Sequence, residues 1–166
     1  MIPTIATVTL GGDIKKKLKA ISKAGFHSIE LFDTDLDRFK GSSKELNNWI
    51  KDFGLNLASY FPLRNFEGMH EEKKESVFNE AKYYLDTAKE LGSEMVMICS
   101  NTNQESLPNE EKITSDLNEL AEIAKNFEIK LAYEALAWGT HVNGYRHAMQ
   151  LIHDADHENL GIALDA

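Results

Sequence analysis

Two apolar runs in the sequence are each followed by an acidic side chain. Residues 131–133 precede Glu134, and residues 160–164 precede Asp165. Burying a carboxylate behind an apolar run is costly unless a partner neutralises it, and a divalent cation is one such partner. Carboxylate oxygens suit Mg²⁺ or Mn²⁺, and a nearby imidazole would extend the range to Zn²⁺ or Co²⁺. Metal binding by these two acids therefore stands beside a structural alternative, in which each caps a helix or pairs with a basic side chain.

Other polar side chains also occur at or just after apolar runs. Glu30 lies near the end of one run, Tyr60 and then Arg64 follow another, and Ser100 and Asn101 follow a third. The planar guanidinium of Arg64 suits two-pronged recognition of a carboxylate, although a surface arginine is the alternative. Glu30 on its own is compatible with a structural role or with a hydrogen bond to a substrate.

The segment after Glu134 adds an aromatic, an imidazole and an amide side chain within nine residues: Trp138, His141 and Asn143. Histidine changes charge near neutral pH, so His141 is suited to moving protons in a reaction. An ordinary loop histidine is the alternative, and Trp138 has the alternative of closing the top of the fold.

The elements that must position these residues follow from hydrophobic patterning. Short apolar runs predict strands at residues 4–9, 28–32, 56–60, 95–99, 130–134 and 160–165. Apolar residues at helical spacing predict helices at residues 13–24, 43–53, 71–91, 110–127 and 145–156. Gly25, Gly54 and Gly92 each follow a predicted helix end, where a left-handed backbone favours glycine. Strands that alternate with helices predict a parallel sheet, whose strand ends meet at one edge.

The repeat length favours a barrel over other parallel α/β folds. No glycine-rich phosphate-binding motif follows the first strand. Units of about thirty residues suit a (β/α)₈ TIM barrel, but eight units need roughly 250 residues. We therefore expect one domain over residues 1–166: the N-terminal portion of a TIM barrel, incomplete, with about six strands and five helices.

Composition excludes several classes of protein. The chain has 166 residues, 42% of them hydrophobic, and a net charge of −9, which disfavours binding to nucleic acid phosphates. It has neither an apolar run of about 18 residues nor a secretory leader, so we expect no membrane association. The single cysteine, Cys99, rules out an intrachain disulfide and fits the expected cytoplasmic location.

Several segments resemble the bacterial 3-dehydroshikimate dehydratases, which belong to the sugar phosphate isomerase/epimerase-like (xylose isomerase-like) TIM-barrel superfamily. They are ATVTLGG (6–12), AGFHSIELFDTDL (24–36), FPLRNFEGM (61–69), ICSN (98–101), YEALAWGTHVNGYR (133–146) and IALD (162–165). The resemblance spans the chain. It implies a metal-dependent lyase that converts 3-dehydroshikimate to protocatechuate by eliminating water.

The resemblance also implies roles for the residues above. A divalent metal, Mg²⁺, Mn²⁺ or Co²⁺, would be held by four side chains, two of which match Glu134 and Asp165. The other two come from later strands, so we expect weak or absent metal binding and negligible activity for these 166 residues alone. From the chemistry of such a reaction, and not from the resemblance, we expect His141 to transfer protons and Arg64 to bind the substrate carboxylate. The remaining substrate-binding candidates are Glu30, Tyr60, Ser100, Asn101, Trp138 and Asn143.

Three alternatives remain open. A sugar phosphate isomerase or epimerase would use similar metal and enediolate chemistry on another substrate. The chain would also fit the N-terminal part of a fusion labelled 4-hydroxyphenylpyruvate dioxygenase. Finally, an open barrel exposes sheet edges, so an inactive, self-associating fragment is the non-enzymatic alternative. We expect a small-molecule substrate and a homo-oligomer.

Overall fold

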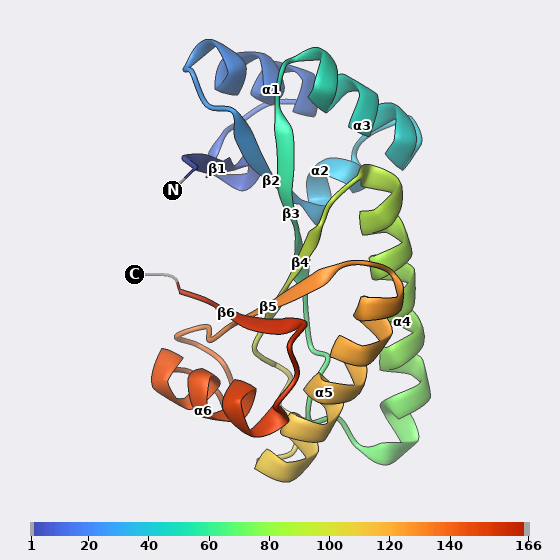
Figure 1. Cartoon of the computed structure of the whole chain (residues 1–166), viewed down its shortest axis with the longest axis vertical. Helices are drawn as coiled ribbons and strands as arrows, with labels where there is room; N and C mark the ends of the chain where they lie inside the picture. Colours follow the sequence, from blue (N-terminus) through green and yellow to red (C-terminus); the bar gives the residue numbers. More distant parts are fainter. Residues whose placement is uncertain (1, 165–166) are drawn as a thin grey trace.

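The computed structural model describes residues 2–164. Its six strands form one parallel sheet in sequential order, with each strand hydrogen-bonded to its neighbour in the chain (Figure 1). The strands are β1 (Thr4–Ala6), β2 (Ser28–Phe32), β3 (Asn56–Leu63), β4 (Met95–Cys99), β5 (Lys130–Glu134) and β6 (Leu160–Ala163). This confirms the predicted parallel α/β sheet.

The helices lie on the outer, convex side of the curved sheet, and among the described residues none of them covers its inner, concave side (Figure 1). They are α1 (Ile14–Lys23), α2 (Asp33–Asp37), α3 (Ser43–Asp52), α4 (Glu71–Leu91), α5 (Glu110–Asn126) and α6 (Tyr145–Ala155), with a 3₁₀ turn, η1 (Thr7–Thr9). Sequential strands with helices outside are the arrangement of a TIM barrel, present here as an incomplete barrel.

Two local features differ from the prediction. The expected first strand, 4–9, is a strand only over β1 and then turns into η1. The prediction of five helices was wrong by one, because α2 follows β2 directly. This helix has five residues, too few to show a helical hydrophobic period, although its early aspartates suit the positive end of a helix.

Two further strands differ from the prediction. The sixth, expected over 160–165, ends at Ala163, and β3 continues three residues beyond Tyr60 and includes Pro62. Proline has no N–H to donate to a neighbouring strand. The pairing of β3 with β4 shifts register between Tyr60 and Leu63, so the strand tolerates the proline there.

The predicted glycine positions are confirmed. Gly25, Gly54 and Gly92 have φ values of 85°, 70° and 73°. Gly92 is the C-cap of α4. These left-handed residues end each helix and turn the chain toward the next strand.

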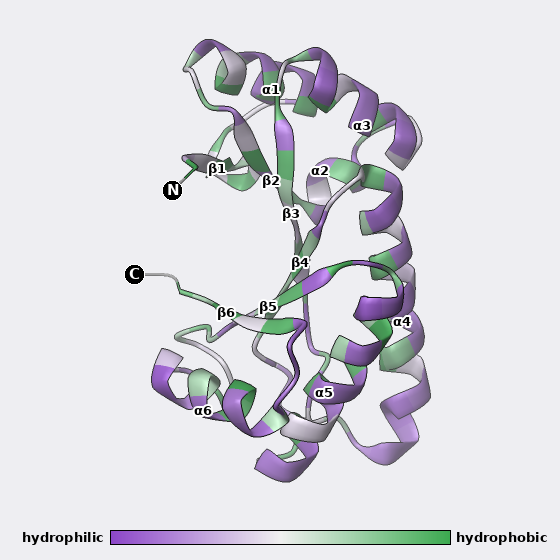
Figure 2. Cartoon of the chain, in the orientation of Figure 1, coloured by the Kyte–Doolittle hydropathy of each residue, from purple (hydrophilic) through white to green (hydrophobic). Residues whose placement is uncertain are grey.

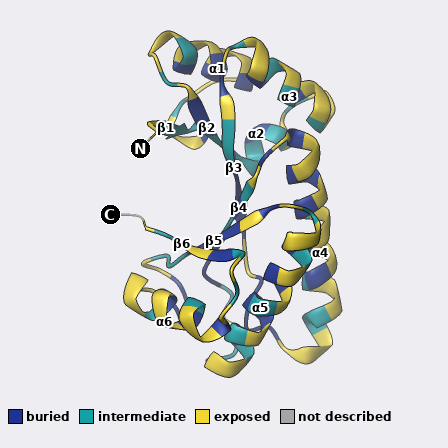
Figure 3. Cartoon of the chain, viewed as in Figure 1, coloured by how far each residue is buried: buried dark blue, intermediate teal, exposed yellow. Residues whose placement is uncertain are grey.

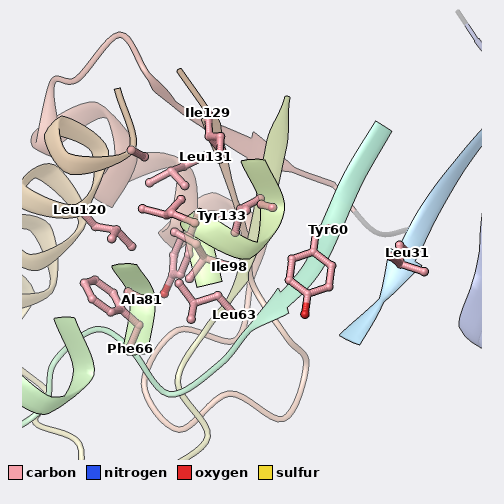
Figure 4. Packing of buried hydrophobic residues seen from close by; sticks show 14 of the residues in the cluster. Leu31, Tyr60, Leu63, Phe66, Ala81, Ile98, Leu120, Ile129, Leu131 and Tyr133 are labelled. Atoms are coloured by element: carbon pink, nitrogen blue, oxygen red, sulfur yellow. The ribbon is translucent and has the colours of Figure 1, made fainter. Parts of the chain in front are cut away.

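The core lies between the sheet and the helix layer. Leu31, Ile98, Leu131 and Tyr133 are buried, and Figure 4 shows the last three beside Phe66 and Leu120. The outward faces of the helices are mostly hydrophilic and exposed (Figures 2 and 3). Because alternate strand residues point to opposite faces, burying one set of side chains directs the other set toward the open side of the sheet. Over residues 2–164, no helix is both long and apolar enough to cross a membrane.

Candidate active site

A cavity of about 730 Å³ opens on the inner side of the sheet, and every strand contributes to its lining. The lining brings together polar side chains from β2, from the ends of β4 and β5 and from the segments that follow β3, β4 and β5. The predicted residues among them are Glu30, Arg64, Ser100, Glu134 and Trp138. Half of the predicted site is thus gathered around one cavity, although the residues come from distant positions in the chain.

Glu134 ends β5 beside Cys99, its register partner on β4. The Cys99 thiol donates a hydrogen bond to Glu134 Oε2, with 3.1 Å between Sγ and the oxygen. Burial, and then the neighbouring carboxylate, raise the pKa of the Cys99 thiol well above its usual value. Cys99 therefore remains a protonated donor that orients Glu134, which sequence reasoning did not anticipate.

Arg64 lies at the rim of the cavity in an ordered position. Its Nη1 pairs with the Asp33 carboxylate, and its guanidinium lies 5.4 Å from the centre of the Phe32 ring. The side chain of Arg64 is 44% exposed, so it remains accessible to a ligand. The sequence did not reveal Asp33 as a site residue, because its ion pair with Arg64 joins positions 31 residues apart.

Glu30 and Ser100 line the cavity and are also hydrogen-bonded to neighbouring segments. Glu30 accepts a bond from the Ser59 hydroxyl at 3.3 Å, across the β2–β3 pair. The Ser100 hydroxyl accepts a bond from the backbone N–H of Leu136 at 2.9 Å. These bonds hold both side chains in place on the cavity wall.

Four predicted residues do not line the cavity: Tyr60, Asn101, His141 and Asn143. Tyr60 is 4% exposed and stacks on Tyr84, with 4.3 Å between ring centres, in the layer between β3 and α4. Asn143 is exposed after the end of β5. Successive side chains of a strand point to opposite faces, which is why Tyr60 is directed away from the open side.

Asn101 and His141 are hydrogen-bonded within the loops that surround the cavity. The backbone carbonyl of Asn101 accepts a bond from the N–H of Thr140 at 2.8 Å. The His141 Nε2–H donates to the carbonyl of Ser106, with 2.8 Å between the atoms. This bond leaves Nδ1 as the ring nitrogen that can accept a proton. The roles assigned to these residues stay predictions.

The residues that the structure describes do not complete a metal centre. Asp165 lies outside the described residues, so its expected pairing with Glu134 is not seen. Among residues 2–164, no group of three or more His, Cys, Asp and Glu side chains is arranged to hold a metal ion. Glu134 is a hard oxygen donor of a suitable type, but one carboxylate is fewer ligands than a bound Mg²⁺ or Mn²⁺ requires.

Glu67 is a further residue that sequence reasoning missed. It is 1% exposed, in the loop between β3 and α4, and accepts hydrogen bonds from Tyr133 and Asn101. Burial raises the pKa of this carboxyl to about 7, against the lowering effect of those two bonds. The sequence feature that could have indicated a buried acid is its position between Phe66 and the glycine at 68, beside further apolar side chains.

Comparison with known proteins identifies related chains. A family model described as xylose isomerase-like TIM barrel matches residues 18–166. The chain is 37% identical over 163 residues to a 3-dehydroshikimate dehydratase of Pseudomonas putida, a match that covers 98% of this chain and 26% of that protein. A relative of the same name from Pseudomonas aeruginosa is 38% identical with the same coverage. The chain therefore spans about a quarter of the length of these curated relatives.

Solved structures show the same fold. A xylose isomerase-like TIM barrel/4-hydroxyphenylpyruvate dioxygenase fusion protein superimposes with a TM-score of 0.94 at 37% identity, over 96% of this chain and 26% of that chain. The IOLI protein with a bound zinc atom has a TM-score of 0.87 at 22% identity, over 99% and 63% of the two chains. A Mycobacterium smegmatis barrel in complex with magnesium has a TM-score of 0.69 at 20% identity, over 99% and 64%. Related structures thus bind zinc or magnesium.

Proposed function

The chain belongs to the xylose isomerase-like TIM barrel family, and we propose that it forms the carboxylate-binding side of a 3-dehydroshikimate dehydratase. The observation that carries this proposal is the shared cavity, which has the Arg64 guanidinium and the Glu134 carboxylate around one space. The substrate has a carboxylate at one end of its ring and a β-hydroxy ketone at the other. The 37% identity to the dehydratase of Pseudomonas putida supports this choice of substrate.

The reaction removes one molecule of water from the substrate. A base takes the proton next to the ketone, and the electron pair left behind forms an enolate. The β-hydroxyl group then leaves as water after receiving a proton from an acid. A proton of the remaining ring CH₂ group finally moves to the ketone oxygen, which becomes a phenol hydroxyl of the aromatic product. The enolate carries the developing negative charge, so groups that stabilise charge near the ketone oxygen lower the barrier.

The described residues have distinct proposed roles in this scheme. Arg64 donates two parallel hydrogen bonds to the substrate carboxylate, and Asp33 holds its guanidinium at the rim. Glu30 accepts hydrogen bonds from substrate hydroxyls. His141 transfers protons through Nδ1, because its Nε2–H is bonded to a backbone carbonyl. His141 does not line the cavity in this structure, so its role requires the segment after β5 to approach the substrate.

The proposal includes a divalent cation, Mg²⁺, Mn²⁺ or Co²⁺, with Glu134 and Asp165 as two of its ligands. Such a cation would supply Lewis acidity at the ketone oxygen. The described residues alone do not complete its coordination shell, so we expect weak metal binding by the 166-residue chain. We also propose a cytoplasmic location, which fits the one buried, unpaired cysteine, Cys99.

A chimera tests the proposed function directly. The 163-residue segment of the Pseudomonas putida dehydratase that matches this chain is replaced by the chain itself, and protocatechuate absorbance is followed after adding 3-dehydroshikimate. Turnover by the chimera, abolished by Glu134→Ala, supports the proposal. A folded chimera without turnover contradicts it. The same chimera assayed with keto sugar phosphates tests the isomerase or epimerase alternative, and the isolated chain is expected to show negligible turnover.

A further inference from the structure

Glu67 joins three segments around the cavity through one buried carboxyl group. Its Oε1 accepts hydrogen bonds from the Tyr133 hydroxyl at 2.8 Å and from the backbone N–H of Asn101 at 2.7 Å. Its backbone carbonyl accepts another bond from Asn101 Nδ2 at 2.6 Å. Glu67 follows Arg64 closely in the chain, so these bonds connect the loop that carries the arginine to β5 and to the loop after β4.

Each partner of Glu67 is also the chain neighbour of a cavity residue. Asn101 follows Ser100, and Tyr133 precedes Glu134. A displacement of either partner is therefore passed directly to a side chain that lines the cavity. Tyr133 is 0% exposed and points into the layer between sheet and helices, so Glu67 acts from behind the cavity wall and does not touch a ligand itself.

The second oxygen of this carboxyl is unusual for a residue with a purely structural role. Oε2 is buried and has no hydrogen-bond partner among the residues that the structure describes. Burying a carboxyl group with an unsatisfied oxygen is costly, and an apolar side chain of similar size would avoid that cost.

The groups that face Glu67 determine its charge. They are the Tyr133 hydroxyl from β5, the Cys99 thiol from β4 and the Asp116 carboxylate from α5. Asp116 holds the same loop by accepting a bond from the Gly68 N–H at 2.9 Å, and it is itself paired with Lys112. Burial raises the pKa of Glu67 to about 7, and the charge of Asp116 adds to that effect.

We propose that Glu67 is a positioning residue, whose buried carboxyl holds the ends of β3, β4 and β5 in the arrangement that the cavity requires. The stability of this closed arrangement depends on pH. When the loops open, the carboxyl regains water and its ordinary pKa, so ionisation favours the open form. With a pKa of about 7 in the closed form and 4.5 in the open form, opening becomes about tenfold more favourable between pH 6 and pH 8.

Hydrogen exchange measured by mass spectrometry on the whole chain tests this inference. The reporters are peptides covering residues 64–70, 100–107 and 131–142, and peptides from α1 serve as the internal reference. Glu67→Leu removes the hydrogen bonds and keeps the volume, Glu67→Gln keeps an acceptor and the shape, and Tyr133→Phe removes a single donor. Glu72→Leu, at an exposed position of α4, is the matched control.

Glu67→Leu should accelerate exchange about tenfold in all three reporter segments, with α1 and the control variant unchanged. Tyr133→Phe should give a smaller acceleration in the same segments. Glu67→Gln should exchange as slowly as the wild-type chain at pH 6, unlike Glu67→Leu. After correction for intrinsic exchange, opening in the wild-type chain should increase about tenfold from pH 6 to pH 8, and Glu67→Gln should abolish that increase.

Two results would overturn the inference. One is acceleration that is uniform along the chain, α1 included, which is the signature of general destabilisation. The other is a Glu67→Gln variant that keeps the full pH dependence. The measurement needs no substrate, so it tests the role of Glu67 independently of the proposed dehydratase function. Either proposal can fail while the other holds.

Discussion

Arg64 and Glu134, the two charged residues on which the proposed chemistry depends most, each have a protein partner that orients them. Asp33 pairs with the guanidinium, and the Cys99 thiol donates to the carboxylate. A side chain held by a neighbour loses less conformational freedom when a ligand binds, so less binding energy is spent on ordering it. At the scale of residues, the cavity is therefore organised before any ligand arrives.

Arg64→Lys is expected to impair substrate binding, although it keeps the positive charge. Lysine has a single ammonium group and loses the two parallel bonds to a carboxylate. In the chimeric dehydratase, we expect KM to rise roughly tenfold or more and kcat to fall, since a misplaced ring also misplaces the reacting proton. Steady-state kinetics measure both parameters. Arg38→Lys, on the exposed end of α2, is the matched control, and wild-type kinetics in Arg64→Lys would remove Arg64 from the site.

Glu67 is expected to make stability depend on pH. Its pKa is about 7 in the folded chain, against an ordinary value of 4.5 for the unfolded chain, so folding tightens the binding of the proton. The stabilisation is fully present below pH 4.5 and is lost as the pH rises through 7, by an amount on the order of 3 kcal/mol. Urea unfolding at pH 5 and pH 8 should show this loss in the wild-type chain and not in Glu67→Gln. If the wild-type chain and Glu67→Gln lose the same unfolding free energy between pH 5 and pH 8, the pH dependence comes from other groups.

At the scale of elements, the loops after β3, β4 and β5 form one connected layer. The Asn101 carbonyl accepts a bond from Thr140, the Ser100 hydroxyl accepts one from Leu136, and Glu67 bonds to both Asn101 and Tyr133. These hydrogen bonds fix the positions of the loops relative to one another, which explains how three separate strand ends can present one cavity wall.

Gly139 is a sensitive point in this layer. A Cβ at this position would overlap the carbonyl oxygen of Val142 and lie 2.6 Å from Ser100 Oγ. Gly139→Ala should therefore displace the loop and destabilise the fold by about 1–3 kcal/mol. Gly144→Ala is the control, since a Cβ there meets nothing within 4 Å and neither position has a positive φ. Thermal unfolding compares the two, and an equal melting temperature for both variants would contradict the expected overlap.

At the scale of the whole molecule, the inner side of the sheet is open. Among the described residues, β1 pairs only with β2 and β6 pairs only with β5. Val8 is 48% exposed and Leu164 is 65% exposed, and both line the cavity on this side. Unpaired edges together with exposed apolar side chains favour association with another chain.

We therefore propose that the 166-residue chain forms a homodimer or a higher oligomer through its open side. Each Å² of apolar surface buried there would contribute about 25 cal/mol. Light scattering coupled to size exclusion should show a mass above that of the monomer, and Val8→Asp should lower it. Tyr83→Asp, at a position that is 75% exposed on α4, is the control. A monomer at high concentration, or an equal effect of both variants, would contradict the proposal.

Much of the fold was predictable because it depends on local patterns. The strands at 28–32, 95–99 and 130–134 have the predicted bounds, since each is a short apolar run, too short for a helix, between two segments with helical periodicity. The alternation of strands and helices was sufficient to predict a parallel sheet in sequential order. Parallel strands end at one edge, so Glu30, Arg64, Ser100, Glu134 and Trp138 could be predicted to meet.

The remaining features of the site depend on contacts that no local pattern encodes. Glu67 and Tyr133 are 66 positions apart in the chain, and Arg64 is 31 positions from its partner Asp33. Whether a polar residue faces the cavity or the helix layer depends on strand bounds to within one residue, as the placement of Tyr60 shows. The sequence by itself determined which strands form and at which edge their ends meet. The tertiary structure decided which side chains face the cavity and which are buried behind it. Burial and pairing depend on contacts between residues that are distant in the chain, and these residues meet only when the chain folds.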